Sequence, residues 1–373
     1  MSEKKDMRFH DLNLDIIKGR ANGRVLWQPR IGCWFSDRKF TGEPYEAPYA
    51  GLSNADVYRK IGCSDRIYHF NEAMKQYYLD DTIKHSRSDI DDLRWKDVIE
   101  TPVGSIFSVN RRNLSNYGVF PEKWFVETEE DLKVLIYIQE RISYRFDKET
   151  YDRLFAEVGD LGLPSSFVPR VNVQRLFVES MGVEGTIYAL SDFPDTAEEY
   201  FRACGRSDDR YMDAVIEGGY EWINYGDNVH GGVLSPELFI KYVLHEYQRR
   251  NEYLHAHGIF TFAHWDGDCK SLFPYAKETG LDGIEAVTPL PQGDVTLAEA
   301  REAMGGMYMI DGIAAVLFDE MYPLEDLMGQ VRECIELFPD RLIMGISDEL
   351  CSTGTLERVK RVADYVNEYN EKL

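Results

Sequence analysis

The pattern of apolar and polar positions changes near Glu129. From there onward, helical patterns alternate with short apolar runs bounded by Gly, Pro or Asp, which is typical of βα units on a parallel sheet. The predicted strands are Ser166–Pro169, Thr186–Leu190, Trp222–Tyr225, Phe260–Ala263, Gly283–Val287, Met307–Ile310 and Leu342–Ile346. The predicted helices are Glu130–Tyr144, Val173–Met181, Ala197–Glu217, Pro236–His257, Cys269–Thr279, Leu297–Ala303, Leu324–Leu337 and Thr355–Glu371.

The region before Phe125 is irregular and rich in Gly, Pro, Tyr and Asp. Its strand-like pieces are Val25–Trp27, Thr82–His85 and Gly104–Val109, and the charged stretch Asp89–Lys96 is expected to be a solvated turn or short helix. Adding Val25–Trp27 to the seven later strands gives eight, which favours an α/β fold of the (β/α)8 TIM barrel type. We expect one domain, 1–373, with an elaborated section at 1–125 that contributes the first strand and regular βα units at 129–373. The alternative is a doubly wound sheet, but no GxGxxG follows the first strand.

Composition narrows the class of protein. The 373 residues include 42 Lys and Arg against 65 Asp and Glu, a formal charge of −23, which disfavours nucleic acid and anionic membrane surfaces as partners. There is no apolar run long enough to span a bilayer, and no apolar signal segment follows the first residues. The six cysteines lie far apart without a CxxC pair, as expected for reduced thiols in the cytoplasm.

Polar residues follow most predicted strands, where barrel enzymes place their active sites. His264 and Asp266 follow one strand at i and i+2, so they point the same way and suit a single metal ion. The alternative is a histidine capped by a carboxylate without metal. Glu285 lies in the apolar run IEAV and needs a buried partner, either a metal ion, His264 or a base such as Arg30.

The last strand and the first strand add further candidates. Asp348 and Glu349 follow the last strand, where one carboxylate either completes a His/Asp/Glu/Asp shell or serves as an ordinary loop acid. Arg30, near Gln28, suits either an anionic or aromatic substrate or an ion pair with those acids. Other candidates to position a substrate are Asp227, Asn228 and Trp265, and His230 lies on the same glycine-rich loop as Asn228. No P-loop, G-x-S-x-G, HExxH or EF-hand pattern is present.

The run GDNVHGGVLSPELFIKYVLHEYQRRNEYLHAHGIFTFAHWDGD resembles the second half of the uroporphyrinogen decarboxylase superfamily. The later segments GLDGIEAVTPLPQGDVTLAEAREAMG and GISDELCSTGTLERV continue in the family order, and LWQPRIGCW and GVEGTIYALSD are similar to its first strand end and glycine-rich strand. The resemblance implies a (β/α)8 barrel and one of two activities. One is decarboxylation of uroporphyrinogen with an Arg pair and an Asp, and the other is methyl transfer involving a corrinoid protein, with zinc held by His-x-Cys and a distant Cys.

The match to each activity differs. Arg30 falls where the first decarboxylase Arg stands, but the second is missing, and only Asp80 or Asp81 stands near the catalytic Asp. For methyl transfer, His264 matches the family His, and Asp266 and Asp348 stand where the two cysteines belong. Oxygen ligands make a stronger Lewis acid than thiolates, which suits demethylation of a small O- or N-methyl donor.

The resemblance therefore implies a methyltransferase that passes a methyl group to a corrinoid protein. Its metal shell would be His264, Asp266, Glu285 and Asp348, with the first three catalytic, and its substrate-binding residues would be Arg30, Gln28, Asp227, Asn228 and Trp265. Its cofactors would be zinc or another divalent metal and the cobamide of a partner protein, and the family decarboxylases imply a homodimer. The alternatives are uroporphyrinogen decarboxylase or a related decarboxylase, and a non-catalytic ligand-binding paralogue.

Overall fold

The computed structural model describes residues 8–373, which form two compact units. Unit 1 comprises residues 8–71, 149–167 and 220–373, and unit 2 comprises residues 72–148 and 168–219. Unit 1 contains all the candidate site residues of the sequence analysis except Asp80 and Asp81, which lie in unit 2.

Unit 1 is built on a parallel sheet of seven strands in the order β1-β13-β12-β11-β10-β9-β8. Its strands are β1 (Leu26–Trp27), β8 (Phe167–Val168), β9 (Trp222–Val229), β10 (Phe260–Trp265), β11 (Gly283–Val287), β12 (Tyr308–Ala314) and β13 (Leu342–Ser347). Consecutive parallel neighbours with helices between them are the βα pattern expected from the sequence, so the predicted α/β class is confirmed.

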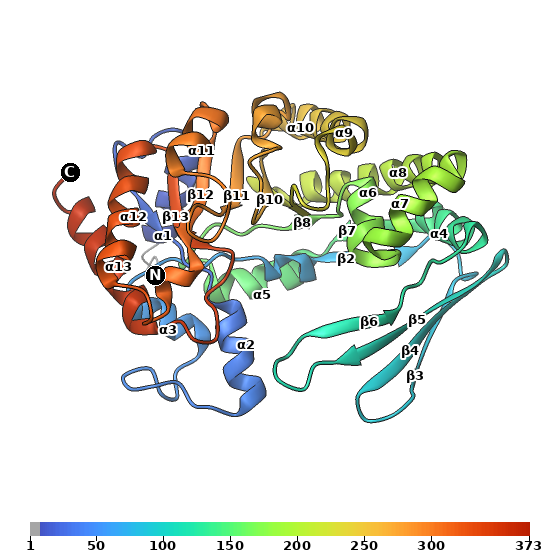
Figure 1. Cartoon of the computed structure of the whole chain (residues 1–373), viewed down its shortest axis with the longest axis horizontal. Coiled ribbons are helices and arrows are strands. Elements are labelled where there is room, and N and C mark those ends of the chain that lie inside the picture. Colours follow the sequence, from blue (N-terminus) through green and yellow to red (C-terminus); the bar gives the residue numbers. More distant parts are fainter. Residues whose placement is uncertain (1–7) are drawn as a thin grey trace. The chain divides into compact units, whose positions relative to one another are not determined.

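Helices cover the outer side of this sheet (Figure 1), with α10 against β10, α11 against β11, and α12 against β12 and β13. The α-helices of unit 1 are α1 (Arg8–Ile17), α2 (Gly32–Thr41), α3 (Asn54–Ile61), α5 (Lys148–Val158), α9 (Pro236–Leu238), α10 (His245–His255), α11 (Leu297–Met304), α12 (Leu324–Leu337) and α13 (Leu356–Asn370). Shorter turns are η1 (His69–Ala73), η3 (Phe239–Leu244), η4 (Phe273–Glu278) and η5 (Ala315–Phe318). The predicted helix start at Pro236 is confirmed, and Ser235 is its cap, because the Ser235 hydroxyl accepts the Leu238 N–H at 3.3 Å.

One predicted strand is wrong. Thr186–Leu190 lies inside helix α7 (Gly182–Asp192) of unit 2. Its buried residues, Gly182, Thr186 and Ala189, follow helical spacing, whereas Ile187 and Tyr188 are exposed. Because Ile187 and Tyr188 are apolar although exposed, the run Thr186–Leu190 reads as continuously apolar, like a buried strand, but only one face of the helix is covered.

An irregular extended segment, residues 63–67, lies between the two ends of the sheet. Ser64 N–H donates to Trp27 O at 2.9 Å on the β1 side. On the β8 side, Asp65 N–H donates to Leu161 O at 3.0 Å, and Ser165 N–H donates to Ile67 O at 3.1 Å. Single backbone bonds rather than a strand ladder thus link β1 to the chain before β8, in the position that an eighth strand of a barrel would take.

The apolar core of unit 1 gathers at the amino ends of the strands. There Ile16 and Ile17 of α1 pack in one cluster with Trp222, Phe262 and Tyr308, all almost fully buried. Each large apolar side chain buried in this way contributes about 2 kcal/mol. Helix α1 thereby covers the amino end of the sheet and leaves the polar residues to the carboxyl end.

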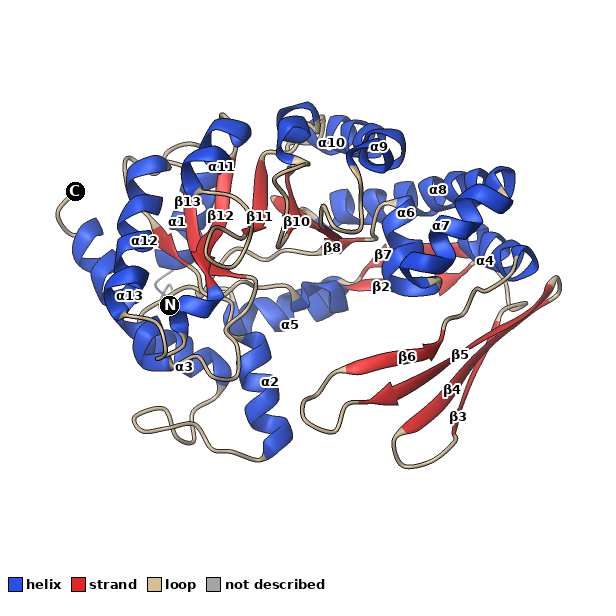
Figure 2. Ribbon diagram, viewed as in Figure 1, coloured by secondary structure: helices blue, strands red, loops and turns tan. Residues whose placement is uncertain are grey.

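Unit 2 is more regular than the sequence suggested for the region before Phe125. Four strands form an antiparallel sheet (Figure 2), and a second antiparallel pair joins β2 to β7. The stretch Asp89–Lys96 is the turn between two of the four strands with the strand ends beside it. The strands are β2 (Met74–Tyr78), β3 (Lys84–Asp89), β4 (Arg94–Thr101), β5 (Gly104–Arg112), β6 (Val119–Lys123) and β7 (Ile142–Phe146), and the helices are α4 (Glu129–Arg141), α6 (Asn172–Arg175), η2 (Leu176–Ser180), α7 and α8 (Pro194–Gly218).

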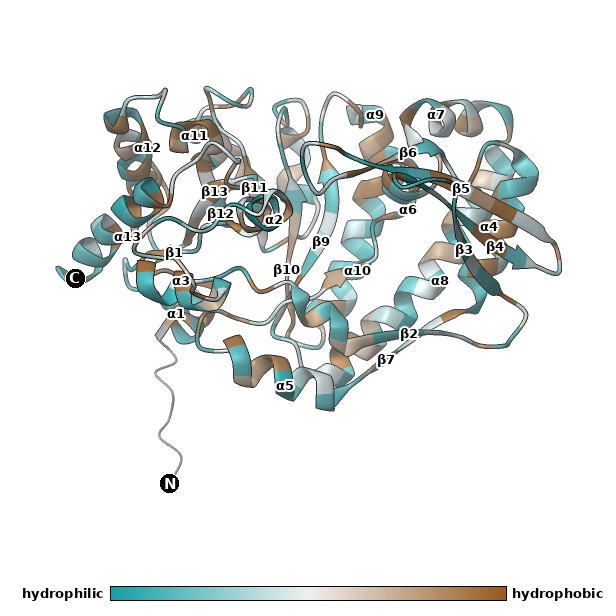
Figure 3. Cartoon of the chain, turned by 90° about the horizontal axis from the view of Figure 1, so that it is seen from below, coloured by the Kyte–Doolittle hydropathy of each residue, from teal (hydrophilic) through white to brown (hydrophobic). Residues whose placement is uncertain are grey.

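The outer helices of unit 1 are amphipathic. Teal and brown residues alternate along α12 and α13 in Figure 3, and in α13 the buried positions include Val359, Val362 and Val366. Their spacing matches a helix with one apolar face. Among residues 8–373, no helix is both long enough and apolar enough to cross a membrane.

Candidate metal and active site

His264 lies near the carboxyl end of β10, directly beside Glu285 of β11 in the strand register. The Nδ1 atom of His264 lies 3.0 Å from Glu285 Oε2 and 3.4 Å from Arg30 Nη1, so this nitrogen is held by the chain's own side chains. The opposite nitrogen, Nε2, lies 3.5 Å from Asp348 Oδ1 and 3.9 Å from Asp266 Oδ1. A histidine anchored through one nitrogen, with its other nitrogen toward two carboxylates, is the arrangement typical of a metal ligand.

Three side chains offer ligand atoms that lie within 4.8 Å of one another: His264, Asp266 and Asp348. Asp266 follows β10 and Asp348 follows β13, so the ends of two strands bring them together. One imidazole nitrogen and two carboxylate oxygens suit zinc or another divalent cation. The donor set therefore fits the metal that the sequence suggested, through three of the four expected ligands.

The electrostatics of the two aspartates also favour a cation. Burial raises the pKa of Asp266, and the neighbouring Asp348 raises it further. Two like charges at such a separation destabilise each other, and a bound cation or a proton removes the repulsion.

Arg30 follows β1 and lies against the same acids. Its Nη1 donates to Asp348 Oδ1 at 2.7 Å, and its Nη2 lies 3.2 Å from Glu349 Oε1. Burial alone lowers the pKa of Arg30, but Glu285, Glu349 and Asp348 outweigh it and raise the pKa above its ordinary value. Arg30 is therefore a fixed cation whose contacts go to the chain's own carboxylates and, at 3.4 Å, to Nδ1 of His264.

Beneath this layer lies a second arginine that the sequence analysis missed, Arg66. It comes from the irregular segment 63–67 and is ion-paired with Glu285 and, at 2.8 Å, with Asp311 Oδ1. Its Nε donates to Gln28 Oε1 at 2.6 Å. The side chains of Arg66, Glu285 and Asp311 are at most 2% exposed, so this is a fully buried charge network.

Glu285 is the junction of the two layers. Its Oε1 pairs with Arg66, and its Oε2 accepts from Asn224 Nδ2 at 2.6 Å and contacts the His264 imidazole. Burial raises the pKa of both Glu285 and Asp311, while Arg30 and Arg66 oppose the rise. Glu285 thus anchors His264 on the side of the ring away from Asp266 and Asp348. The buried-base partner considered for Glu285 in the sequence is present, but it is Arg66.

Some predicted substrate-binding residues lie outside the cluster. Asp227 is buried and accepts the Tyr247 hydroxyl of α10 at 2.6 Å, while Asn228 is exposed. Trp265 packs edge-to-face on Phe239, with 5.4 Å between the rings. The structure therefore brings together Arg30, His264, Asp266, Glu285 and Asp348, with Gln28 joined through Arg66.

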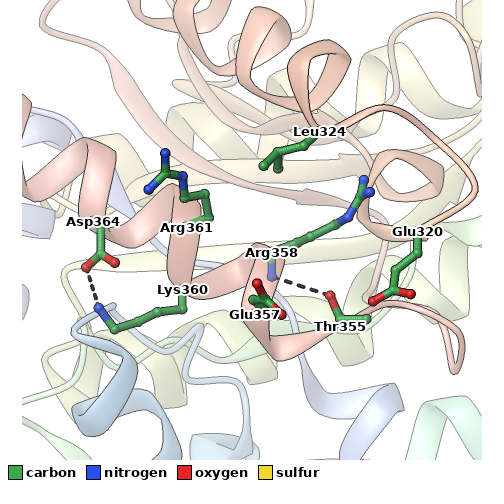
Figure 4. A pocket seen from close by; sticks show the side chains of 8 residues that line it. All are labelled: Glu320, Leu324, Thr355, Glu357, Arg358, Lys360, Arg361 and Asp364. Carbon is green, nitrogen blue, oxygen red and sulfur yellow. Dashed lines mark hydrogen bonds and ion pairs between the residues drawn. The ribbon is translucent and has the colours of Figure 1, made fainter.

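A separate pocket of about 570 Å³ lies beside the first turns of α13 (Figure 4). Its lining carries both signs of charge, and Lys360 pairs there with Asp364. Thr355 accepts the Arg358 N–H at 3.4 Å as the helix cap. None of the clustered side chains listed above lines this pocket.

A sheet of parallel strands that carries a charged site at its carboxyl edge is the arrangement of α/β proteins, TIM barrels among them. The family model of uroporphyrinogen decarboxylase (URO-D) matches residues 177–369, slightly more than half of the chain. The chain belongs to the uroporphyrinogen decarboxylase family. No curated protein matches the sequence.

Solved structures extend the comparison of the fold. A methyltransferase from Methanosarcina mazei is 12% identical with a TM-score of 0.55, over 95% of this chain and 97% of that one. A B12-independent methionine synthase from Shewanella sp. W3-18-1, in complex with selenomethionine, is 12% identical with a TM-score of 0.46, over 94% and 99% of the two chains. At this identity, the likeness to the methyltransferase shows the shared fold alone.

Proposed function

We propose that this chain is a methyltransferase that moves a methyl group from a small O- or N-methyl donor to a corrinoid protein, assisted by a metal ion. The observation that carries the proposal is the convergence of His264, Asp266 and Asp348, with Nε2 of the histidine turned toward both carboxylates. Zinc or another divalent ion, when bound there, supplies a Lewis acid for the oxygen or nitrogen that the methyl group leaves.

The chain's own residues prepare this site. Glu285 contacts Nδ1 and fixes the direction of the His264 ring, and Arg66 opposes the rise that burial causes in the pKa of Glu285. Arg30 holds Asp348 at the rim of the site. These contacts position the ligands before any donor arrives, which reduces the reorganisation that binding requires.

The charge balance argues against decarboxylation of a polycarboxylate. The site gathers five carboxyl groups, of Asp266, Glu285, Asp311, Asp348 and Glu349, and two guanidinium groups, of Arg30 and Arg66. Both arginines already bind the chain's own acids, so neither is available to a substrate carboxylate. Asp80, an alternative decarboxylase acid, lies in unit 2, where it pairs with Arg141 at 3.1 Å.

Metal content is the first test. Protein purified without chelator should contain close to one equivalent of a divalent metal by elemental analysis, and His264→Ala should lose it. His257→Ala is the matched control, because His257 is exposed on another loop and its imidazole bonds to the Tyr253 carbonyl. If the wild-type chain neither holds nor takes up zinc, cobalt or manganese, the metal-assisted version is wrong.

Methyl transfer is the second test. The chain is incubated with reduced cobalamin as a surrogate for the corrinoid protein and with aryl methyl ethers and methylated amines, and methylcobalamin is followed by absorbance. We expect turnover with at least one donor and its loss in His264→Ala. Release of carbon dioxide from uroporphyrinogen in place of methyl transfer would establish the decarboxylase alternative. Donor binding that is unchanged in His264→Ala, without turnover, would establish a ligand-binding paralogue.

A further inference from the structure

A second histidine, His230, lies on the glycine-rich loop after β9, where three loops meet. Gly231 N–H donates to Asp268 O at 2.8 Å and joins this loop to the loop after β10. Gly267 N–H, in turn, donates to Thr288 Oγ1 at 3.2 Å and joins the loop after β10 to the one after β11. His230 therefore belongs to a bonded layer at the carboxyl ends of three neighbouring strands.

Gly232 and Gly267 lie in close contact with the His230 ring. A Cβ atom on Gly232 would lie 2.8 Å from His230 Cε1, and one on Gly267 would lie 2.8 Å from Cδ2. Real side chains do not approach this closely, so both positions need glycine for the ring to lie where it does. Gly267 also has a φ of +65°, which disfavours other residues. The ring is held from both sides.

The tautomer of His230 follows from one hydrogen bond. The backbone N–H of Gly232 donates to His230 Nδ1 at 3.0 Å, so Nδ1 offers a lone pair and the proton of the neutral ring lies on Nε2. In His264, Nδ1 faces Glu285 and Arg30, while Nε2 faces Asp266 and Asp348. Nε2 of His264 therefore lies where a cation would bind, whereas Nε2 of His230 is suited to donate a hydrogen bond.

The glycine contacts also place His230 beside the candidate site. A Cβ atom on Gly267 would lie 3.0 Å from His230 Nε2, so this nitrogen lies against the backbone of Gly267. Asp266 directly precedes Gly267 in the chain. The chain geometry therefore places His230 in the neighbourhood of Asp266.

We infer that His230 is a substrate-binding residue that donates its Nε2–H to the oxygen from which the methyl group departs, an inference that rests on the proposed function. As the O–CH3 bond breaks, its electron pair stays on the oxygen and the methyl group passes to the reduced cobalt of the corrinoid. The proton remains on His230, and its hydrogen bond stabilises the negative charge that develops on oxygen. Loss of one such donor lowers kcat by roughly 10²–10³-fold.

The kinetic test uses methyl ethers of phenols that differ in the pKa of the leaving phenol. His230→Ala should lower kcat, and the loss should grow as the phenol becomes less acidic, because more charge then develops on oxygen. His230→Gln, which retains an N–H donor, should recover part of the rate, and His257→Ala should behave as wild type. Metal content should be unchanged in His230→Ala, because Nε2 carries a proton. A loss of metal, or a decrease in rate that is the same for every phenol, would overturn the inference.

A second measurement does not depend on turnover. The nitrogen chemical shifts of His230 should identify the Nε2–H tautomer, and addition of 4-nitrophenolate should shift Nε2 and bind several-fold more tightly to wild type than to His230→Ala. Equal binding by the two proteins, or an Nδ1–H tautomer, contradicts the role of His230 even if methyl transfer is found. Absence of methyl transfer by wild type, with the expected phenolate binding, contradicts the proposed function and leaves His230 as a phenolate-binding residue.

Discussion

Replacement of Arg66 by Met tests whether one buried cation holds the site together. The guanidinium is 2% exposed and contacts four partners: Glu285, Asp311, Gln28 and the Tyr68 hydroxyl. Met preserves most of the side-chain length but none of these interactions. The substitution leaves two buried carboxyl groups without their shared counter-ion.

The expected cost follows from that change. Removal of one partner from a buried ion pair costs about 3–5 kcal/mol, because the remaining charge is uncompensated. One kcal/mol lowers the melting temperature by about 2–4 °C in domains of this size, so we expect a decrease of roughly 10 °C at neutral pH. Without Arg66, the pKa values of Glu285 and Asp311 rise further above those of the unfolded chain. The folded variant then binds more protons than the unfolded one, so its deficit should grow from pH 5 to pH 8.

Thermal and urea unfolding of the full chain at pH 5, 6.5 and 8 measures this dependence. Arg361→Met is the matched control, since Arg361 is an exposed arginine beside the α13 pocket. The double variant Arg66→Met with Glu285→Gln should lose less than the sum of the single variants, because the second change removes one unpaired charge. A loss below about 1 kcal/mol, or one that is independent of pH, would refute the counter-ion role.

The other predictions concern neighbouring residues. Glu285→Gln should weaken metal binding by roughly 10–100-fold, measured by competition with a chelator, because His264 loses its carboxylate anchor; unchanged affinity would contradict that role. Asp65→Asn should stabilise the chain at pH 8 but not at pH 4. Burial raises the pKa of Asp65 to about 7, so the contribution of this carboxyl group to stability falls as the pH rises between about 4 and 7. A difference in urea unfolding that is independent of pH would contradict this. Gly345→Ala should destabilise the chain by about 1–3 kcal/mol, because the new Cβ would lie 2.2 Å from an Asp311 oxygen, whereas Gly306→Ala, with open space around it, should not; equal melting temperatures would contradict the crowding.

Much of the sheet could be predicted from the sequence, because buried parallel strands are short apolar runs with clear boundaries. The run IEAV, for example, corresponds to β11 (Gly283–Val287), and the carboxyl-end rule directed attention to His264, Asp266 and Asp348. The wrong strand, Thr186–Leu190, shows the limit of the method. An apolar run of that length fits a strand or one face of a helix equally well.

Arg66 and Asn224 were missing from the predicted site for different physical reasons. Arg66 lies on a segment without a strand ladder, so no periodicity indicated that it faces the interior. Asn224 did leave a signal, since it is a polar residue inside the apolar run of β9. Alternation along β9 also separates Asn224, which meets Glu285, from Asp227, which meets Tyr247. The sequence contained that information, because the face of a strand, and not only the position after its end, decides which polar residues meet the site.

The backbone hydrogen bonds of segment 63–67 also determine where the molecule opens locally to water. Its amides are held by isolated bonds to Trp27, Leu161 and neighbouring residues, while β12 and β13 are joined by a continuous ladder from Met309 to Ala314. Isolated bonds open at a lower free energy than a ladder. In hydrogen–deuterium exchange, the seam beside Arg66 should therefore take up deuterium before the ladder does, and water should reach the buried charges of unit 1 by that route.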